Sequence, residues 1–106
     1  MPALIDRLNE RLDQGFDDAL LRFALGKALL DAKDMERAAS HLREAVLKAP
    51  DFSAAWAQLG RCELALGHEA AALNAWEKGC AAARLRGEIQ AERQISVWLK
   101  RARKGT

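Results

Sequence analysis

The sequence has few prolines and cysteines, and its N-terminus lacks a long apolar stretch. Its 106 residues include two prolines, two cysteines and no tyrosine, whereas alanine, leucine, arginine and glutamate are abundant. This composition favours helix throughout the chain. At the N-terminus a charge at Asp6 interrupts the sequence before an apolar stretch can form, which argues against a signal peptide or a membrane span. We therefore expect a cytoplasmic protein that has no membrane partner.

The sequence also lacks a large excess of charge of either sign, because its formal net charge is only +2. A balance this small does not indicate nucleic acid as a partner. The basic run from Lys100 to Lys104 ends a predicted helix that has an acidic first turn, an order that the helix dipole favours. No aromatic platform is interleaved with the run, apart from Trp98 on the apolar stripe. We expect no nucleic-acid partner and interpret the run as helix capping.

Residues with catalytic or metal-binding chemistry are few and isolated. Neither Cys62 nor Cys80 has a Cys or His neighbour at metal-ligand spacing, so both are expected to be free thiols. His41 and His68 lack the Ser, Asp or Cys arrangement that would make either a catalytic base. The sequence also has no phosphate loop and no paired carboxylates at a plausible cleft. We expect no metal, no cofactor and no enzymatic activity.

What the chain does contain is an internal repeat. Leu25-Gly26 and Leu59-Gly60 both interrupt predicted helices, and the two glycines lie 34 residues apart. A period of this length is typical of a repeat array of helical hairpins. The same shift superposes further residues: Lys27 on Arg61, Leu30 on Leu64, Ala38 on Ala72 and Ala49 on Ala83.

Local signals divide the chain into six helices and leave no room for strands. Asp34 is a candidate N-cap, and Asp51 and Ser53 offer N-cap oxygens to the helix that follows them. Gly67 and Gly87 fit the left-handed position just past a helix end. The helices are expected near residues 3–14, 18–32, 35–48, 53–66, 69–84 and 88–103.

The spacing of residues within each repeat points to one family. The pattern W-x₂-L-G-x₂-Y, then A-x₃-F, then P is matched by two sets of residues: Trp56, Leu59, Gly60, Ala72 and Trp76 in the second unit, and Leu25, Gly26, Leu29, Ala38, Leu42, Ala45 and Pro50 in the first. The sequence therefore resembles the tetratricopeptide repeat family, and it is similar to small stand-alone bacterial members. The resemblance implies an all-α fold in which antiparallel helical hairpins stack as a short right-handed solenoid.

The resemblance also implies one domain with closed ends. Its expected parts are a leading helix (1–16), two repeats (19–52 and 53–86), and a capping helix with a tail (87–106). The leading helix would cover Leu21 and Leu25. The capping helix would dock on the second hairpin through its apolar stripe, which consists of Ala91, Ile95, Trp98, Leu99 and Ala102.

Several positions depart from the family pattern. Arg22 and Glu63 replace its tryptophan and tyrosine, Gly79 replaces a small alanine, and Arg84 replaces the proline. Losing that proline predicts that the second helix of the second hairpin continues past its usual end.

The helical glycines are explained by close packing within each hairpin. We expect Gly26 to admit Leu42 or Ala38, and Gly60 to admit Trp76 or Ala72.

Members of this family bind peptides or partner proteins in a concave groove formed by the first helix of each hairpin. Lys27 and Arg61 would then form a small positive ladder able to pair with a carboxylate. A solvated lysine and arginine explain the same residues equally well. The expected groove residues are Leu20, Phe23, Lys27, Leu30, Ala54, Ala57, Arg61 and Leu64.

The family's asparagine-bearing carboxylate clamp is missing. Lys27 and Arg61 stand where asparagines would be expected, and Phe23 and Ala57 where a lysine would be. Binding to the acidic tails of heat-shock chaperones is therefore not implied.

Together these features predict a non-catalytic scaffold for a protein or peptide that carries an acidic group or a C-terminal carboxylate. The alternative is a structural module that self-associates as a homodimer without a peptide ligand. We accordingly expect a monomer or a weak homodimer.

Overall fold

The computed structural model describes residues 2–105 and shows an all-α chain. These residues form six helices and no strand: α1 (Pro2–Asp13), α2 (Ala19–Asp31), α3 (Met35–Lys48), α4 (Ser53–Ala65), α5 (Glu69–Leu85) and α6 (Ile89–Lys104). Each helix begins and ends within one residue of the position expected from the sequence. The predicted fold class is therefore confirmed.

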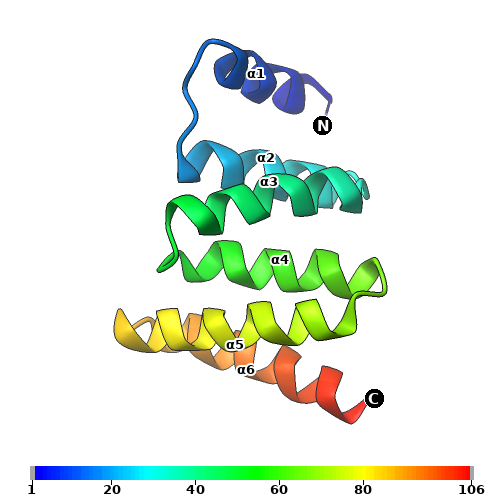
Figure 1. Ribbon diagram of the computed structural model, residues 1–106, viewed down its shortest axis with the longest axis vertical. Coiled ribbons are helices and arrows are strands. Elements are labelled where there is room, and N and C mark those ends of the chain that lie inside the picture. The colour runs from blue at the N-terminus through cyan, green and yellow to red at the C-terminus, as the bar shows by residue number, and fades with distance from the viewer. Residues whose placement is uncertain (1, 106) are drawn as a thin grey trace.

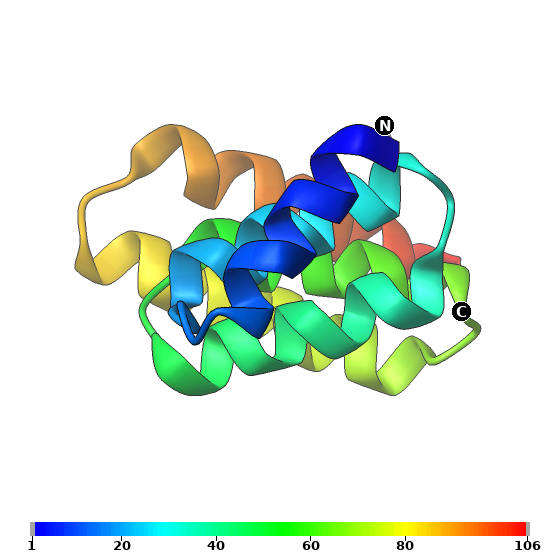
Figure 2. The same cartoon turned by 90° about the horizontal axis from the view of Figure 1, so that it is seen from above.

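The helices stack as layers of hairpins along the long axis of the molecule. The hairpins α2–α3 and α4–α5 lie in the middle, with α1 at one end and α6 packed against α5 at the other (Figure 1). The view from above shows α1 crossing over the hairpin beneath it (Figure 2). The stack measures 41 Å along its longest axis and 19 Å along its shortest. This arrangement is a short helical-repeat solenoid.

Several turns use the local chemistry that the sequence predicts. The Asp34 side chain accepts a hydrogen bond from a backbone N–H at the start of α3 (3.4 Å). Gly67 and Gly87 have φ angles of +83° and +70°, in the left-handed region where glycine is favoured. The structure adds a second carboxylate cap at Asp18, whose Oδ1 accepts from the Leu21 N–H at 2.8 Å.

The predicted cap of α4 is wrong. The N-cap residue is Phe52, and α4 has no side-chain cap hydrogen bond. The Ser53 hydroxyl donates instead to Glu88, and the Asp51 carboxylate accepts from Arg86 at 2.7 Å. Both oxygens are thus used by residues after the second hairpin, which local sequence alone does not reveal.

The two helical glycines permit close approach within the hairpins, as expected. A Cβ atom placed on Gly26 would lie 2.5 Å from Cγ of Leu42, and one placed on Gly60 would overlap the indole of Trp76. The Trp76 indole also donates a hydrogen bond to the Ala57 carbonyl at 3.0 Å. Each glycine therefore leaves space for a large side chain of the partner helix.

The C-terminal helix α6 closes the array through the predicted apolar stripe. Ile95 and Leu99 are only 1% and 7% exposed, and the Trp98 ring lies 6.0 Å from that of Trp76 between centroids. Gly79 on α5 lies close to both α4 and α6, since a Cβ atom placed on this glycine would lie 3.0 Å from Cβ of Trp56 and 3.2 Å from Cδ1 of Ile95. As the missing proline predicts, α5 continues to Leu85, which lies beyond residue 82, the repeat equivalent of the last residue of α3, Lys48.

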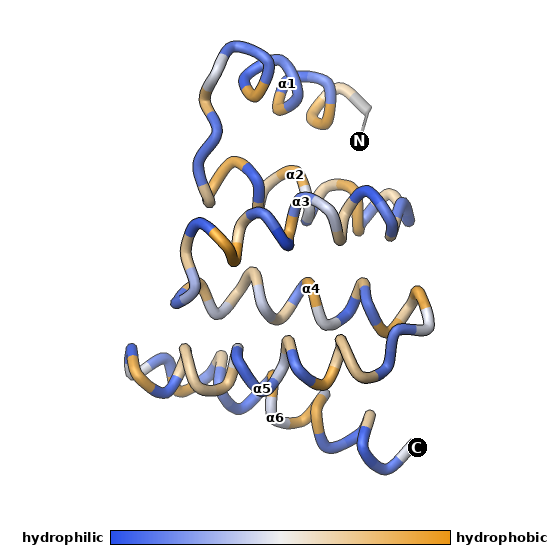
Figure 3. Tube along the Cα trace, viewed as in Figure 1, coloured by the Kyte–Doolittle hydropathy of each residue, from blue (hydrophilic) through white to orange (hydrophobic). Residues whose placement is uncertain are grey.

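The N-terminal helix α1 covers the other end less completely. Its apolar residues lie on the side toward α2 and its hydrophilic residues on the outer side (Figure 3). Leu21 and Leu25 beneath it are buried, and Ile5 packs against the main core. None of the α1 side chains described from residue 3 onward is fully buried, however.

Candidate functional site

The eight residues expected to line the groove lie on α2 and α4, which contact each other. Leu20 is 68% exposed and Leu64 is 41% exposed, and Ala54 is also exposed. Phe23 is half-buried, with its ring 4.9 Å from the Phe52 ring. These side chains offer apolar surface to a partner.

Two of the eight residues belong to the core instead of the surface. Leu30 is 4% exposed and packs in the cluster formed mainly by α2, α3 and α4. Ala57 is 7% exposed and packs in the cluster that includes Ile95 and Leu99 of α6. In each case the cluster includes residues of the next layer of the stack: α4 for Leu30 and α6 for Ala57. The repeat pattern within one hairpin therefore does not reveal that these two residues are buried.

The two expected cations have different surroundings. Lys27 Nζ lies 3.0 and 3.1 Å from the carboxylate oxygens of Asp31, one turn further along α2. Arg61 donates to Gln58 at 2.9 Å, and its Cζ lies 5.6 Å from the centroid of the Trp98 ring. Lys27 therefore has a carboxylate partner on its own helix, whereas Arg61 extends toward α6.

A large hollow adjoins Arg61 and Leu64. It has a volume of about 660 Å³ and is open to solvent between α4, α5 and α6; we call it the α4–α6 cleft. Its lining residues are Arg61, Leu64, Ala65, Trp76, Trp98, Arg101 and Ala102.

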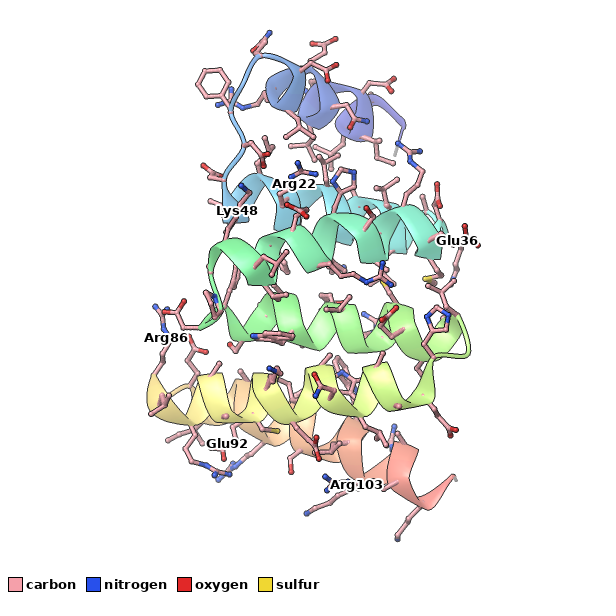
Figure 4. The ribbon with its side chains drawn as sticks, viewed as in Figure 1. Arg22, Glu36, Lys48, Arg86, Glu92 and Arg103 are labelled. Atoms are coloured by element: carbon pink, nitrogen blue, oxygen red, sulfur yellow. The ribbon has the colours of Figure 1, made fainter. Side chains whose placement is uncertain are left out.

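The α4–α6 cleft carries the guanidinium groups of Arg61 and Arg101. Within residues 2–105, neither Arg61 nor Arg101 forms an ion pair. Two other arginines of the C-terminal half are paired: Arg86 with Asp51, and Arg103 with Glu77 (both Arg86 and Arg103 are labelled in Figure 4). The cleft thus combines positive charge with aromatic surface.

Sequence reasoning missed the contribution of α6 to this cleft. It assigned Trp98 to the docking stripe and Arg101 to helix capping. The signal was nevertheless present, because the 34-residue shift that relates Leu30 to Leu64 continues to Trp98. The tryptophan serves both roles, since it packs on Trp76 and also lines the cleft.

A buried carboxylate joins the two hairpins on another side of α4. Glu63 is 6% exposed, although its position in the repeat pattern is that of a tyrosine. Its Oε1 accepts a hydrogen bond from Arg43 of α3 at 2.7 Å and lies 3.3 Å from Nδ1 of His68. The group links consecutive layers of the stack and lies outside the α4–α6 cleft.

The thiols are poorly suited to nucleophilic chemistry. Burial raises the pKa of Cys62 to about 11, and burial also raises the pKa of Cys80. A raised thiol pKa lowers the fraction of reactive thiolate at neutral pH. Both cysteines are free.

Residues 2–105 provide neither a metal site nor a membrane span. No group of three or more of their His, Cys, Asp or Glu side chains converges as a metal site would require. No described helix has the length and apolarity needed to span a bilayer.

Stacked helical hairpins with small residues at fixed offsets define a helical-repeat protein. A family model described as tetratricopeptide repeat matches residues 29–91. The chain therefore belongs to the tetratricopeptide repeat family, as its motifs predict.

Relatives and solved structures agree with this assignment. The chain is 47% identical over 98 residues to the TPR repeat-containing protein PA0015 of Pseudomonas aeruginosa, covering 92% of this chain and 93% of the relative. The solution structure of protein BPP2914 from Bordetella parapertussis is 40% identical, with a TM-score of 0.83 over 99% of this chain and 91% of the other. The TPR2B domain of yeast Sti1, described in complex with pHsp70, has a TM-score of 0.90 at 18% identity, over 99% of this chain and 84% of that one. This last likeness shows the shared fold.

Proposed function

We propose that this protein is a non-catalytic cytoplasmic scaffold that binds a peptide or partner protein along the face formed by α2, α4 and α6. The observation that carries the proposal is the α4–α6 cleft, which lies beside Arg61 and Leu64 and joins apolar surface to two arginines that form no ion pair within residues 2–105. Family membership supports it, because tetratricopeptide repeats are protein-interaction modules. The complex of the Sti1 domain with pHsp70 is an example of such binding in a structural relative.

The expected partner carries an acidic group or a terminal carboxylate. Of the eight groove residues, Leu20, Phe23, Ala54 and Leu64 supply accessible or half-accessible apolar surface, and Arg61 supplies charge. Lys27 contributes less net charge to this face, because the Asp31 carboxylate lies 3.0 Å from its Nζ.

The test compares capture of proteins from a native lysate by the wild type and by the double variant Lys27→Glu/Arg61→Glu. The control Arg93→Glu/Lys104→Glu makes the same charge change at two exposed α6 residues that do not line the α4–α6 cleft. A partner retained by the wild type and the control but lost by the groove variant supports the proposal. It must then bind the purified chain directly. Equal capture by all three folded proteins contradicts the proposal.

Self-association is the second candidate, and exposed apolar residues at the α1–α2 corner favour it. Phe16 is 53% exposed, and together with Leu20 it lines a hollow of about 250 Å³. Exposed apolar patches are frequent at protein interfaces. Light scattering over a range of protein concentrations separates the candidates: a stable dimer mass, lost in the variant Phe16→Ser/Leu20→Ser, favours self-association.

A further inference from the structure

We propose that the α4–α6 cleft recognises an acidic peptide in which a carboxylate lies next to a large apolar side chain. Arg61 and Arg101 bind the carboxylate, and Trp98 and Leu64 contact the apolar side chain. This inference rests on the proposed scaffold function and specifies the ligand class and two residues, Trp98 and Arg101, that the repeat motif does not identify.

Electrostatics carry the first step. Arg61 and Arg101 come from different helices, line one cleft and have no carboxylate partner within residues 2–105. Two like charges at the same concave surface repel each other, and an anion between them relieves that repulsion. Guanidinium groups also match a carboxylate with paired N–H donors. The cleft therefore favours a carboxylate over a neutral group.

Aromatic packing carries the second step. Trp98 is half-buried, and its ring is held against Trp76 with an interplanar angle of 47°. Arg61 lies over the Trp98 ring, so the charged group and the aromatic surface are neighbours. Leu64, at 41% exposure, extends the apolar surface. Since these groups are adjacent, the acidic and apolar parts of the ligand must be adjacent as well.

Size carries the third step. Binding pockets for small ligands commonly have volumes of about 300 to 1,000 Å³, and the volume of the α4–α6 cleft, about 660 Å³, falls in that range. The cleft therefore has room for a few side chains of an extended peptide. The equivalent cation of the first hairpin, Lys27, has an exposed carboxylate partner on its own helix, Asp31, so the net positive charge of this face is greater in the C-terminal half.

The experiment selects ligands for the full chain from two libraries of random hexapeptides. One library presents the hexapeptide between glycine-serine linkers, and the other presents it at a free C-terminus. We expect Asp or Glu beside Leu, Phe, Met or Trp in the first library if a side-chain carboxylate is bound. A large apolar last residue in the second library would indicate the terminal carboxylate.

An enriched peptide is then synthesised and its affinity measured for wild type and variants. Because Arg61→Gln/Arg101→Gln removes charge-assisted hydrogen bonds to the carboxylate, we expect this double variant to weaken binding by about tenfold or more. The matched control Arg93→Gln/Lys104→Gln removes the same charge from α6 outside the α4–α6 cleft and should change affinity less than about twofold. Replacing the peptide's carboxylate by an amide should weaken binding to the wild type but not to the cleft variant.

The outcomes separate this inference from the proposed function. Enriched peptides that lack a carboxylate, or that bind the cleft variant and the control equally, overturn the inference and leave the scaffold function standing. Absence of enrichment in both libraries also overturns the inference, and the lysate capture described above then decides the scaffold function by itself. Circular dichroism of each variant ensures that a loss of binding is not a loss of folding.

Discussion

The two hairpins of this protein use the same repeat positions in different ways. Leu30 in the first hairpin is 4% exposed, whereas Leu64, its equivalent in the second, is 41% exposed. Lys27 has a carboxylate partner on its own helix, whereas Arg61 extends over a ring of α6. The difference arises from the neighbouring layer: α4 packs beside α2, while α6 supplies the next layer beside α4. Equivalent sequence positions thus acquire different roles from tertiary context.

The largest expected effect comes from removing the helices that flank the hairpins. Deleting residues 87–106 exposes the second hairpin and removes the buried Ile95 and Leu99. At about 1.5 to 3 kcal/mol for each buried side chain, the loss approaches the whole stability of a small domain, about 5 kcal/mol or more. Deleting residues 1–15 removes no described side chain that is fully buried but uncovers part of Leu21 and Leu25, and should cost less, about 3 kcal/mol or less.

Thermal unfolding and binding of a hydrophobic dye measure this difference between the ends. We expect dye binding or aggregation for the C-terminal deletion and a folded, less stable protein for the N-terminal one. Equal stability of the two deletions would show that α1 and α6 protect their hairpins to the same extent.

The next largest difference is expected between alanine substitutions of the two helical glycines, which should destabilise the second hairpin more than the first. In Gly60→Ala the new Cβ overlaps the Trp76 indole, which is a rigid ring already hydrogen-bonded to Ala57. Overpacking of this kind costs about 1 to 3 kcal/mol, and we expect the upper part of that range. Gly26→Ala should cost less, about 1 kcal/mol, because the leucine side chain that its Cβ meets is smaller than the indole and is not fixed by a hydrogen bond. Urea denaturation measures the free energy of unfolding of both variants. A larger decrease for Gly26→Ala than for Gly60→Ala would contradict the prediction.

The contact between the hairpins should depend on the buried carboxylate. Arg43→Met leaves Glu63, whose side chain is 8% exposed, with His68 as its remaining polar partner. We expect a loss of about 1 to 2 kcal/mol. The comparison Arg86→Met removes an exposed arginine from its pair with Asp51 and should change stability by less than about 0.5 kcal/mol.

A double variant tests the cause of that loss. If the uncompensated charge of Glu63 is responsible, Arg43→Met/Glu63→Gln should be more stable than Arg43→Met alone. Similar stability of the two variants would show that the arginine acts mainly through its packing.

The smallest effect is a dependence on pH confined to the first hairpin. Burial, with a smaller contribution from Arg22, lowers the pKa of His41, whereas the equivalent residue of the second hairpin is Ala75. The folded state therefore favours the neutral form of His41. The resulting contribution of His41 to folding stability is present above its unfolded-state pKa of about 6.5 and is lost as the pH falls through its lower folded-state pKa. Because His41 is partly exposed, we expect less than about 1 kcal/mol between pH 7 and pH 5.

Urea denaturation at both pH values, compared between wild type and His41→Gln, measures this contribution. The variant should lose less stability on acidification. If both proteins lose the same amount, other groups cause the pH dependence.

Sequence reasoning was most successful where the determinants are local or periodic. The 34-residue shift and the turn residues predicted every helix end within one residue, and Gly26 and Gly60 predicted which side chains fill the hairpins. It failed for Ser53, whose hydroxyl bonds to Glu88 instead of capping its own helix. It also placed Leu30 and Ala57 on the groove surface, although both are buried. Each error involves a partner from another layer of the stack.

The amino-acid sequence by itself determined the repeat family, the helices and the packing inside each hairpin, because helical periodicity and small residues act over short distances along the chain. Only the tertiary structure decided which repeat-equivalent residues remain accessible. Trp98 and Arg101 reach Arg61 and Leu64 because α6 packs beside α4. Exposure and charge pairing depend on the neighbouring helix, and the α4–α6 cleft exists only where two layers meet.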